Sequence, residues 1–155
     1  MRKLILLLSH LAMLAFGFAL GIYALPILTE TTAPSTSELQ AKATDARYRG
    51  EFVRDLEDSD LLHWGEGTVY IDDSKVLMTG KLAPGPDYRL YFSPQFVETE
   101  ADFMRLKGSM REAAPITSFN NFEVALPADL NPDDYSSVIV WCERFSQFIT
   151  AASYR

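Results

Sequence analysis

The single cysteine of the 155-residue chain, Cys142, is the residue best suited to redox chemistry. One cysteine cannot form an internal disulfide, a cluster with four thiolate ligands or a CxxCH haem attachment. A free thiol can form an intermolecular disulfide, bind a metal or a haem, or exchange with other thiols. Equally, a free cysteine can be a small buried hydrophobic residue. The sequence leaves the choice between a reactive and a packed Cys142 open.

The residues around Cys142 predict an inner β-strand over residues 137–142. Strand alternation puts Cys142 and two valines on one face, and Ile139 and Trp141 on the other. Both faces carry bulky apolar groups, which is typical of a central strand. Trp141 is a candidate supporting residue for the cysteine. Burial beside Trp141 would raise the pKa of the thiol and the nearby Arg144 would lower it, and the sequence does not decide between them.

His63 is the second candidate, because it is the only histidine outside the apolar N-terminus. One histidine and one cysteine cannot build a blue-copper centre, or a zinc site with three or four Cys and His ligands, so we expect no metal site. One His with a Met or a Cys could hold a b-type haem, and Met78, Met104 and Met110 are available. The sequence requires no cofactor, however. His63 can also be a strand-start residue beside Trp64 with a hydrogen-bonded or solvated ring.

Enzymatic and nucleic-acid-binding functions lack sequence support. The chain has no GxSxG elbow, no HExxH helix and no glycine-rich phosphate loop. The aspartate pairs at 72–73 and 133–134 lie in turn contexts, which explain them adequately. A net charge of -7 offers no basic footprint for a nucleic acid. The sequence therefore favours a non-enzymatic protein that does not bind nucleic acid.

An apolar run over residues 4–28 predicts a membrane span, with Arg2 and Lys3 as the only charged residues up to its end. A helix of this length crosses a hydrocarbon core of about 30 Å with some tilt. A cleavable signal peptide usually has a shorter apolar region of about 7–15 residues, so we favour an uncleaved signal-anchor over residues 1–28. The positive charges ahead of the span predict a cytoplasmic N-terminus and a periplasmic or extracellular C-terminal domain.

The remaining chain divides into a linker at 29–49 and a folded unit at 50–155. The linker is rich in Thr, Ser, Ala and charge, which is typical of a tether, although residues 38–49 could instead extend the anchor helix or cover the domain. Residues 29–155 carry 12 Lys and Arg against 21 Asp and Glu. We expect this acidic part to be repelled by anionic headgroups and to stand off the membrane.

Short strands punctuated by Pro and Gly dominate the folded unit. They include a hairpin over residues 63–82, further strands at 88–92 and 119–126, and a final edge strand at 148–154. One short surface helix is predicted at 98–106. This pattern predicts an all-β antiparallel sandwich or jelly roll.

Four segments of this unit, in order, resemble the DM-thirteen domain, a small extracellular β-sandwich often described as an electron-transfer module. They are residues 63–69 (HWGEGTV), 85–92 (GPDYRLYF), 121–127 (NFEVALP) and 135–145 (YSSVIVWCERF). The resemblance covers nearly the whole unit, but residues 104–115 fit the family pattern more loosely.

The resemblance implies a redox role for Cys142, since the family's cysteine corresponds to it and has been proposed to be redox-active. Animal members lie beside cytochrome-like DOMON modules, and bacterial members are similar to this chain in being anchored or secreted alone. Two hypotheses follow. The first is a membrane-anchored redox or electron-transfer module with a protein or redox partner. The second is a non-enzymatic surface module for binding or structure, in which the cysteine is buried and inert.

Overall fold

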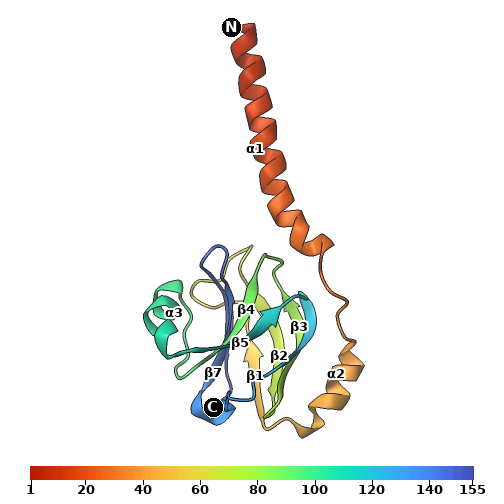
Figure 1. Cartoon of the computed structure of the whole chain (residues 1–155), viewed down its shortest axis with the longest axis vertical. Helices are drawn as coiled ribbons and strands as arrows, with labels where there is room; N and C mark the ends of the chain where they lie inside the picture. The colour runs from red at the N-terminus through yellow and green to blue at the C-terminus, as the bar shows by residue number, and fades with distance from the viewer.

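A computed structural model describes all 155 residues as a long N-terminal helix followed by a β-rich domain (Figure 1). The helices are α1 (Arg2–Leu28), α2 (Thr36–Lys42) and α3 (Glu100–Leu106). The strands are β1 (Tyr48–Phe52), β2 (Gly65–Ile71), β3 (Lys75–Leu82), β4 (Tyr88–Ser93), β5 (Arg111–Ile116), β6 (Asn120–Ala125), β7 (Ser137–Cys142) and β8 (Gln147–Ser153). All strand pairs are antiparallel.

The strands form two four-stranded sheets, in the orders β1-β2-β3-β6 and β5-β4-β7-β8. A cluster of 19 buried residues, drawn from both sheets, makes the central core. A second cluster of eight buried residues joins α3 to the outer face of the second sheet. The predicted antiparallel sandwich behind an apolar N-terminal helix is therefore confirmed.

Strand β7 lies between β4 and β8 and is buried along its whole length. Its two faces belong to different cores, with Val140 and Cys142 in the central cluster and Ile139 and Trp141 in the cluster under α3. A strand with both faces covered needs apolar residues at consecutive positions. The predicted inner strand over residues 137–142 is thus confirmed.

Side-chain hydrogen bonds close the predicted turn at Asp72 and cap the start of helix α3. The Asp72 carboxylate accepts hydrogen bonds from the amides of Ser74 (2.7 Å) and Lys75 (2.9 Å) and so closes the β2–β3 turn. The Thr99 hydroxyl accepts from the Asp102 amide at 3.1 Å and caps the start of α3.

Strand β5 is a structural element that the sequence pattern did not reveal. It lies at the edge of the second sheet and pairs only with β4. Its residues are mostly exposed or half-buried, so apolar and polar residues do not alternate along it. Pro115 is tolerated because a strand at a sheet edge has free positions in its hydrogen-bond ladder.

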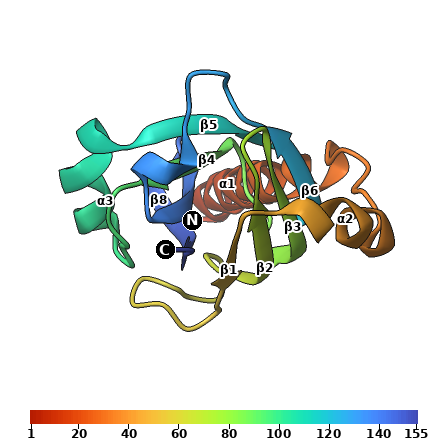
Figure 2. The same cartoon turned by 90° about the horizontal axis from the view of Figure 1, so that it is seen from below.

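Residues 29–49 lie against the sandwich and include helix α2. For residues 38–49 this agrees with the alternative that they cover the domain. The Glu30 carboxylate accepts from the Phe119 amide (2.7 Å) and the Ser118 hydroxyl (3.0 Å). Ser35 and Glu38 form a reciprocal capping box at the start of α2, and Leu39 is fully buried. Figure 2 shows α2 and α3 on opposite sides of the sandwich.

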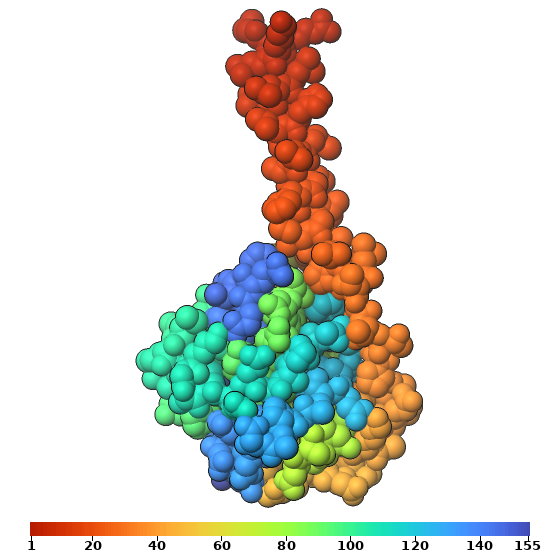
Figure 3. All heavy atoms as spheres, viewed as in Figure 1, coloured from red at the N-terminus to blue at the C-terminus, as the bar shows by residue number.

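Helix α1 projects from one end of the domain, and none of its residues is buried (Figures 1 and 3). Its 27 residues are apolar enough to cross a membrane, a property that an anchor and a signal sequence near the N-terminus share. We call the end of the sandwich beside α1 the cavity end.

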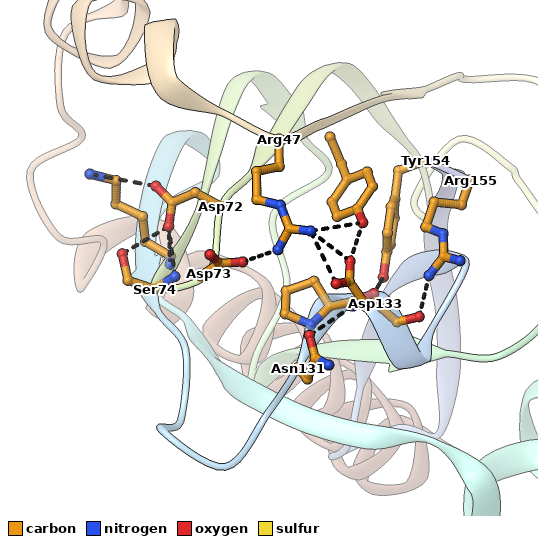
Figure 4. Close-up of polar contacts among 11 residues, drawn as sticks. Arg47, Asp72, Asp73, Ser74, Asn131, Asp133, Tyr154 and Arg155 are labelled. Atoms are coloured by element: carbon orange, nitrogen blue, oxygen red, sulfur yellow. Dashed lines mark hydrogen bonds and ion pairs between the residues drawn. The ribbon is translucent and has the colours of Figure 1, made fainter.

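The opposite end, here the network end, is held by charged groups (Figure 4). Arg47 pairs with Asp73 in the β2–β3 turn and with Asp133, whose carboxylate lies 3.0 Å from a guanidinium nitrogen. The Tyr48 hydroxyl also donates to Asp133, and Arg155 donates to the Asp133 backbone oxygen. These contacts join the start of β1, a hairpin turn and the C-terminus.

Candidate functional site

A cavity of about 230 Å³ lies at the cavity end, between the sandwich and α1. Three segments of the domain line it: the end of the β1–β2 loop, the loop before β4, and the turn from β7 into β8. Helix α1 closes one side with Ala19, Ile22 and Tyr23. Cys142 and His63, which are far apart in the sequence, both line this cavity. The structure therefore brings two of the three candidate residues together.

Cys142 is positioned by the register of the second sheet. It is the last residue of β7 and pairs with Tyr88, the first residue of β4. Its Sγ donates a hydrogen bond of 2.9 Å to the Pro86 carbonyl oxygen, and the residue is 2% exposed. The sulfur is thus held at the cavity wall by the loop that carries the GPD sequence.

Burial raises the pKa of the Cys142 thiol above its ordinary value. The backbone N–H groups of Phe145 and Arg144, and the charge of Arg144, act in the opposite direction and are outweighed. The sequence left this competition open, and the structure decides it in favour of burial. Cys142 is accordingly a protonated thiol at neutral pH, which makes it a slow nucleophile.

His63 is fixed by the carboxylate of Asp60. One Asp60 oxygen lies 3.0 Å from His63 Nδ1, and the other accepts from the His63 amide at 2.8 Å. The hydrogen bond from His63 lowers the pKa of Asp60, which stays ionised. A carboxylate accepts only, so Nδ1 carries a proton in this contact, and Nε2 is the ring nitrogen that the contact leaves unused. The cavity lining therefore contains an imidazole whose ring is held by a carboxylate outside the cavity-lining residues.

Tyr88 and Gly85 shape the cavity wall. The Tyr88 hydroxyl donates to the Ala83 carbonyl oxygen at 2.9 Å, and the ring is buried. A Cβ atom at position 85 would lie only 2.4 Å from the Tyr88 hydroxyl oxygen. Glycine is required here because the backbone passes directly against the phenol.

Trp141, the third candidate, does not reach the cavity. Its ring stacks on Phe103 of α3, with the ring centroids 3.9 Å apart and the planes 9° from parallel. This contact lies on the outer face of the second sheet, whereas Cys142 faces the central core. Neighbours along a strand point to opposite faces, so Trp141 supports the strand rather than the thiol.

The residues do not fit a haem held by His63 and a methionine. Met78 is fully buried in the central core, and Met110 packs on the cluster under α3. Met104 is an exposed residue of α3. No methionine lines the cavity with His63, and no three His, Cys, Asp or Glu side chains gather as metal ligands.

A comparison with family models gives one match, described as electron transfer DM13, over residues 55–154. This match spans well over half of the chain. The chain belongs to the DM13 family. No curated protein and no solved structure matches it. The DM13 match contains Cys142, His63 and all four segments that resemble the family, whereas α1, α2 and β1 precede it.

Several residues that line the cavity of this DM13 domain escaped prediction. Tyr88 and Gly85 belong to a segment noted for its family resemblance, but nothing in the sequence places them beside a thiol. Leu62 and Phe145 lie in loops without a periodic pattern. Helix α1 also lines the cavity, and this contact depends on the orientation of the helix relative to the domain, which no local sequence pattern determines.

Proposed function

We propose that this protein is a membrane-anchored, extracytoplasmic DM13 module that performs thiol redox chemistry at Cys142. The observation that carries the proposal is that the only thiol lines a cavity together with the only imidazole of the domain. The description of the family as an electron-transfer domain supports a redox role. The apolar helix α1, preceded by Arg2 and Lys3, supports an anchor with a cytoplasmic N-terminus.

The reaction that fits one free thiol is exchange with a small disulfide. The Cys142 sulfur attacks one sulfur of the disulfide, a new mixed disulfide forms and the original S–S bond breaks. Cys142 is oxidised, the departing sulfur is reduced, and the thiol proton leaves for the departing thiolate or for water. In this proposal, His63 Nε2 accepts the thiol proton first and then releases it to the departing thiolate or to water. A cavity of about 230 Å³ restricts the partner to a small group.

A second candidate function is a binding or structural module in which Cys142 is inert. It is favoured by the 2% exposure of Cys142 and by the raised pKa of its thiol. The two candidates differ in one measurable property. A redox thiol reacts while the domain is folded, whereas an inert thiol reacts only after the domain unfolds.

The test is the reaction of the full chain, in detergent micelles, with a small neutral aromatic disulfide. A redox role predicts a rate that increases with reagent concentration under native conditions, and a slower rate in His63→Gln. Cys142→Ser is the control and should show no reaction. A native rate that is independent of reagent concentration, and equal to the rate of unfolding, would overturn the redox proposal in favour of the inert cysteine.

A further inference from the structure

Three apolar side chains at the cavity end are exposed to solvent. Leu61 is 90% exposed and Leu62 is 58% exposed, both in the loop between β1 and β2. Phe145, in the turn between β7 and β8, is 50% exposed. No large apolar side chain of the domain is more exposed than Leu61. We call these three residues the apolar tip.

The apolar tip lies beside α1. Leu62 and Phe145 line the same cavity as Ala19, Ile22 and Tyr23 of the helix. Figure 3 shows the β7–β8 turn, in blue, at the top of the domain next to α1. The loops therefore reach back along the helix, to a level well before its end at Leu28.

The length of α1 indicates what surrounds that level. A helix of 27 residues is about 40 Å long, whereas a hydrocarbon core is about 30 Å thick and takes about 20 residues. If the apolar run begins next to Lys3, the core ends close to Ile22 and Tyr23. Tyrosine is enriched at this boundary, where its ring is apolar and its hydroxyl meets the headgroups. The apolar tip thus lies level with the edge of the hydrocarbon core on the side of the membrane that faces the domain.

Two of the four acidic side chains in the β1–β2 loop are engaged within the protein, whereas Asp55 and Glu57 are exposed to solvent. The Asp58 carboxylate accepts from the Glu100 amide at 2.6 Å and so faces α3 rather than α1. Asp60 is engaged by His63. Arg144 precedes Phe145, is exposed, and suits a lipid phosphate. The net acidic charge of the domain disfavours anionic lipids, but this end of the domain fits a zwitterionic surface.

We propose that the apolar tip inserts into the headgroup region of the bilayer that α1 spans, so that the Cys142 cavity is held at the membrane surface. This inference rests on the proposed anchor and not on the redox role of Cys142. Leu61, Leu62 and Phe145 leave water there, and their burial stabilises one orientation of the domain. The domain is then seated on the membrane rather than standing off it.

The experiment measures depth with nitroxide labels on the full chain in phosphatidylcholine vesicles. Labels are placed through Leu61→Cys and Phe145→Cys, and through Asp73→Cys in the β2–β3 turn as the matched control at the network end. The unmodified chain is treated with the same label as a control, and its signal gives the amount of label that reaches the buried Cys142. We expect the ratio of oxygen to water-soluble nickel accessibility to be several-fold higher at positions 61 and 145 than at position 73.

A label-free measurement covers the case in which a labelled variant misfolds. Trp64 follows the loop that carries Leu61 and Leu62. Lipids with bromine on the acyl chain near the headgroup should quench part of the tryptophan emission of the unmodified chain. Trp64→Phe should remove that quenched part.

Each alternative outcome overturns the proposal in a distinguishable way. Chains that fail to float with the vesicles would show that the anchor is wrong, and the docking with it. Chains that float, but carry labels at 61 and 145 as accessible to nickel as the label at 73, would retain the anchor and refute the docking. Strong spin–spin coupling between labels on different copies, at high dilution in lipid, would assign the apolar tip to a second copy instead.

Discussion

At the network end, charged side chains from three distant segments hold one another in place, whereas at the cavity end a thiol, a phenol and apolar side chains line a cavity. Arg47 lies between two carboxylates at the first end. At the second end Cys142 and Tyr88 each donate to a backbone carbonyl oxygen. Ion pairs that remain in water contribute little energy but fix which segments meet. Buried apolar contacts contribute more energy and tolerate substitution less.

The comparison indicates which end is free for function. The network end satisfies its own charges, and its side chains are engaged with one another. The cavity end keeps an imidazole nitrogen without a protein partner and exposes three large apolar side chains. Substitutions at the two ends should therefore differ in the size and in the kind of their effects.

The largest effect is expected for Cys142→Asp. This substitution places a charge on a 2% exposed position at the end of an inner strand, and a buried charge without a partner is strongly unfavourable. We expect a loss of about 4 kcal/mol or more in the free energy of unfolding at pH 7. Denaturant titration of the full chain in detergent measures it, with Cys142→Ser as the uncharged control.

The pH dependence sharpens this test. The loss should shrink as the pH falls and the introduced carboxyl group takes up a proton. A stability curve for Cys142→Asp that overlays that of the wild type at pH 7 would mean that the end of β7 is open to water.

Gly85→Val should have the next largest effect. The added Cβ would lie 2.4 Å from the Tyr88 hydroxyl oxygen, so the ring or the loop must move. Forcing extra groups into a packed site costs about 1–3 kcal/mol. Gly108→Val is the matched control, because a Cβ at position 108 meets nothing within 4 Å. Equal denaturation midpoints for the two variants would show that the loop at Gly85 adapts freely.

The third effect concerns the reactivity of the Cys142 thiol. Below the pKa of the thiol, the alkylation rate should increase about tenfold for each unit of pH, because only the thiolate reacts. Because burial raises the pKa of Cys142, the thiolate fraction at neutral pH is small and increases as the pH rises. The rate of alkylation of the folded chain should keep increasing beyond the ordinary thiol pKa of about 8.5. Stopped-flow measurements of the alkylation rate between about pH 6 and about pH 10 would follow this increase. A plateau reached below pH 8 would show that Arg144 outweighs burial.

Local patterns predicted the parts of this molecule that local forces determine. The run of consecutive apolar residues along β7 gave its bounds, and the turn at Asp72 depends on a side chain two or three residues from the amides that it binds. Strand β5 was missed because an edge strand with Pro115 carries no alternating pattern.

The candidate site was predicted only in part, for a physical reason. Cys142 and His63 stood out by residue type, but their shared cavity is formed by loops and by α1, which no local pattern brings together. Trp141 was grouped with Cys142 because it is adjacent in sequence, although strand geometry points the two side chains to opposite faces. The pKa of the thiol likewise depends on burial, which is a property of the whole fold.

The smallest effect is expected at the network end, for Asp133→Asn. The hydrogen bond from Tyr48 and the contact with Arg47 lower the pKa of Asp133. A carboxyl group with a lowered folded-state pKa stabilises the fold above its ordinary pKa of about 4, and this stabilisation disappears as the pH falls through the folded-state value. Asp133→Asn should therefore unfold slightly earlier than the wild type at pH 7, by less than Gly85→Val. The two midpoints should converge at acid pH.

Asp129→Asn removes the same charge from a single exposed pair with Arg111 and should leave the midpoint unchanged. Salt at 1 M, where the screening length is about 3 Å, should reduce the effect of Asp133→Asn. A loss as large as that of Gly85→Val, independent of both pH and salt, would mean that Asp133 acts through packing. The contrast between a charged end and an apolar end would then have to be abandoned.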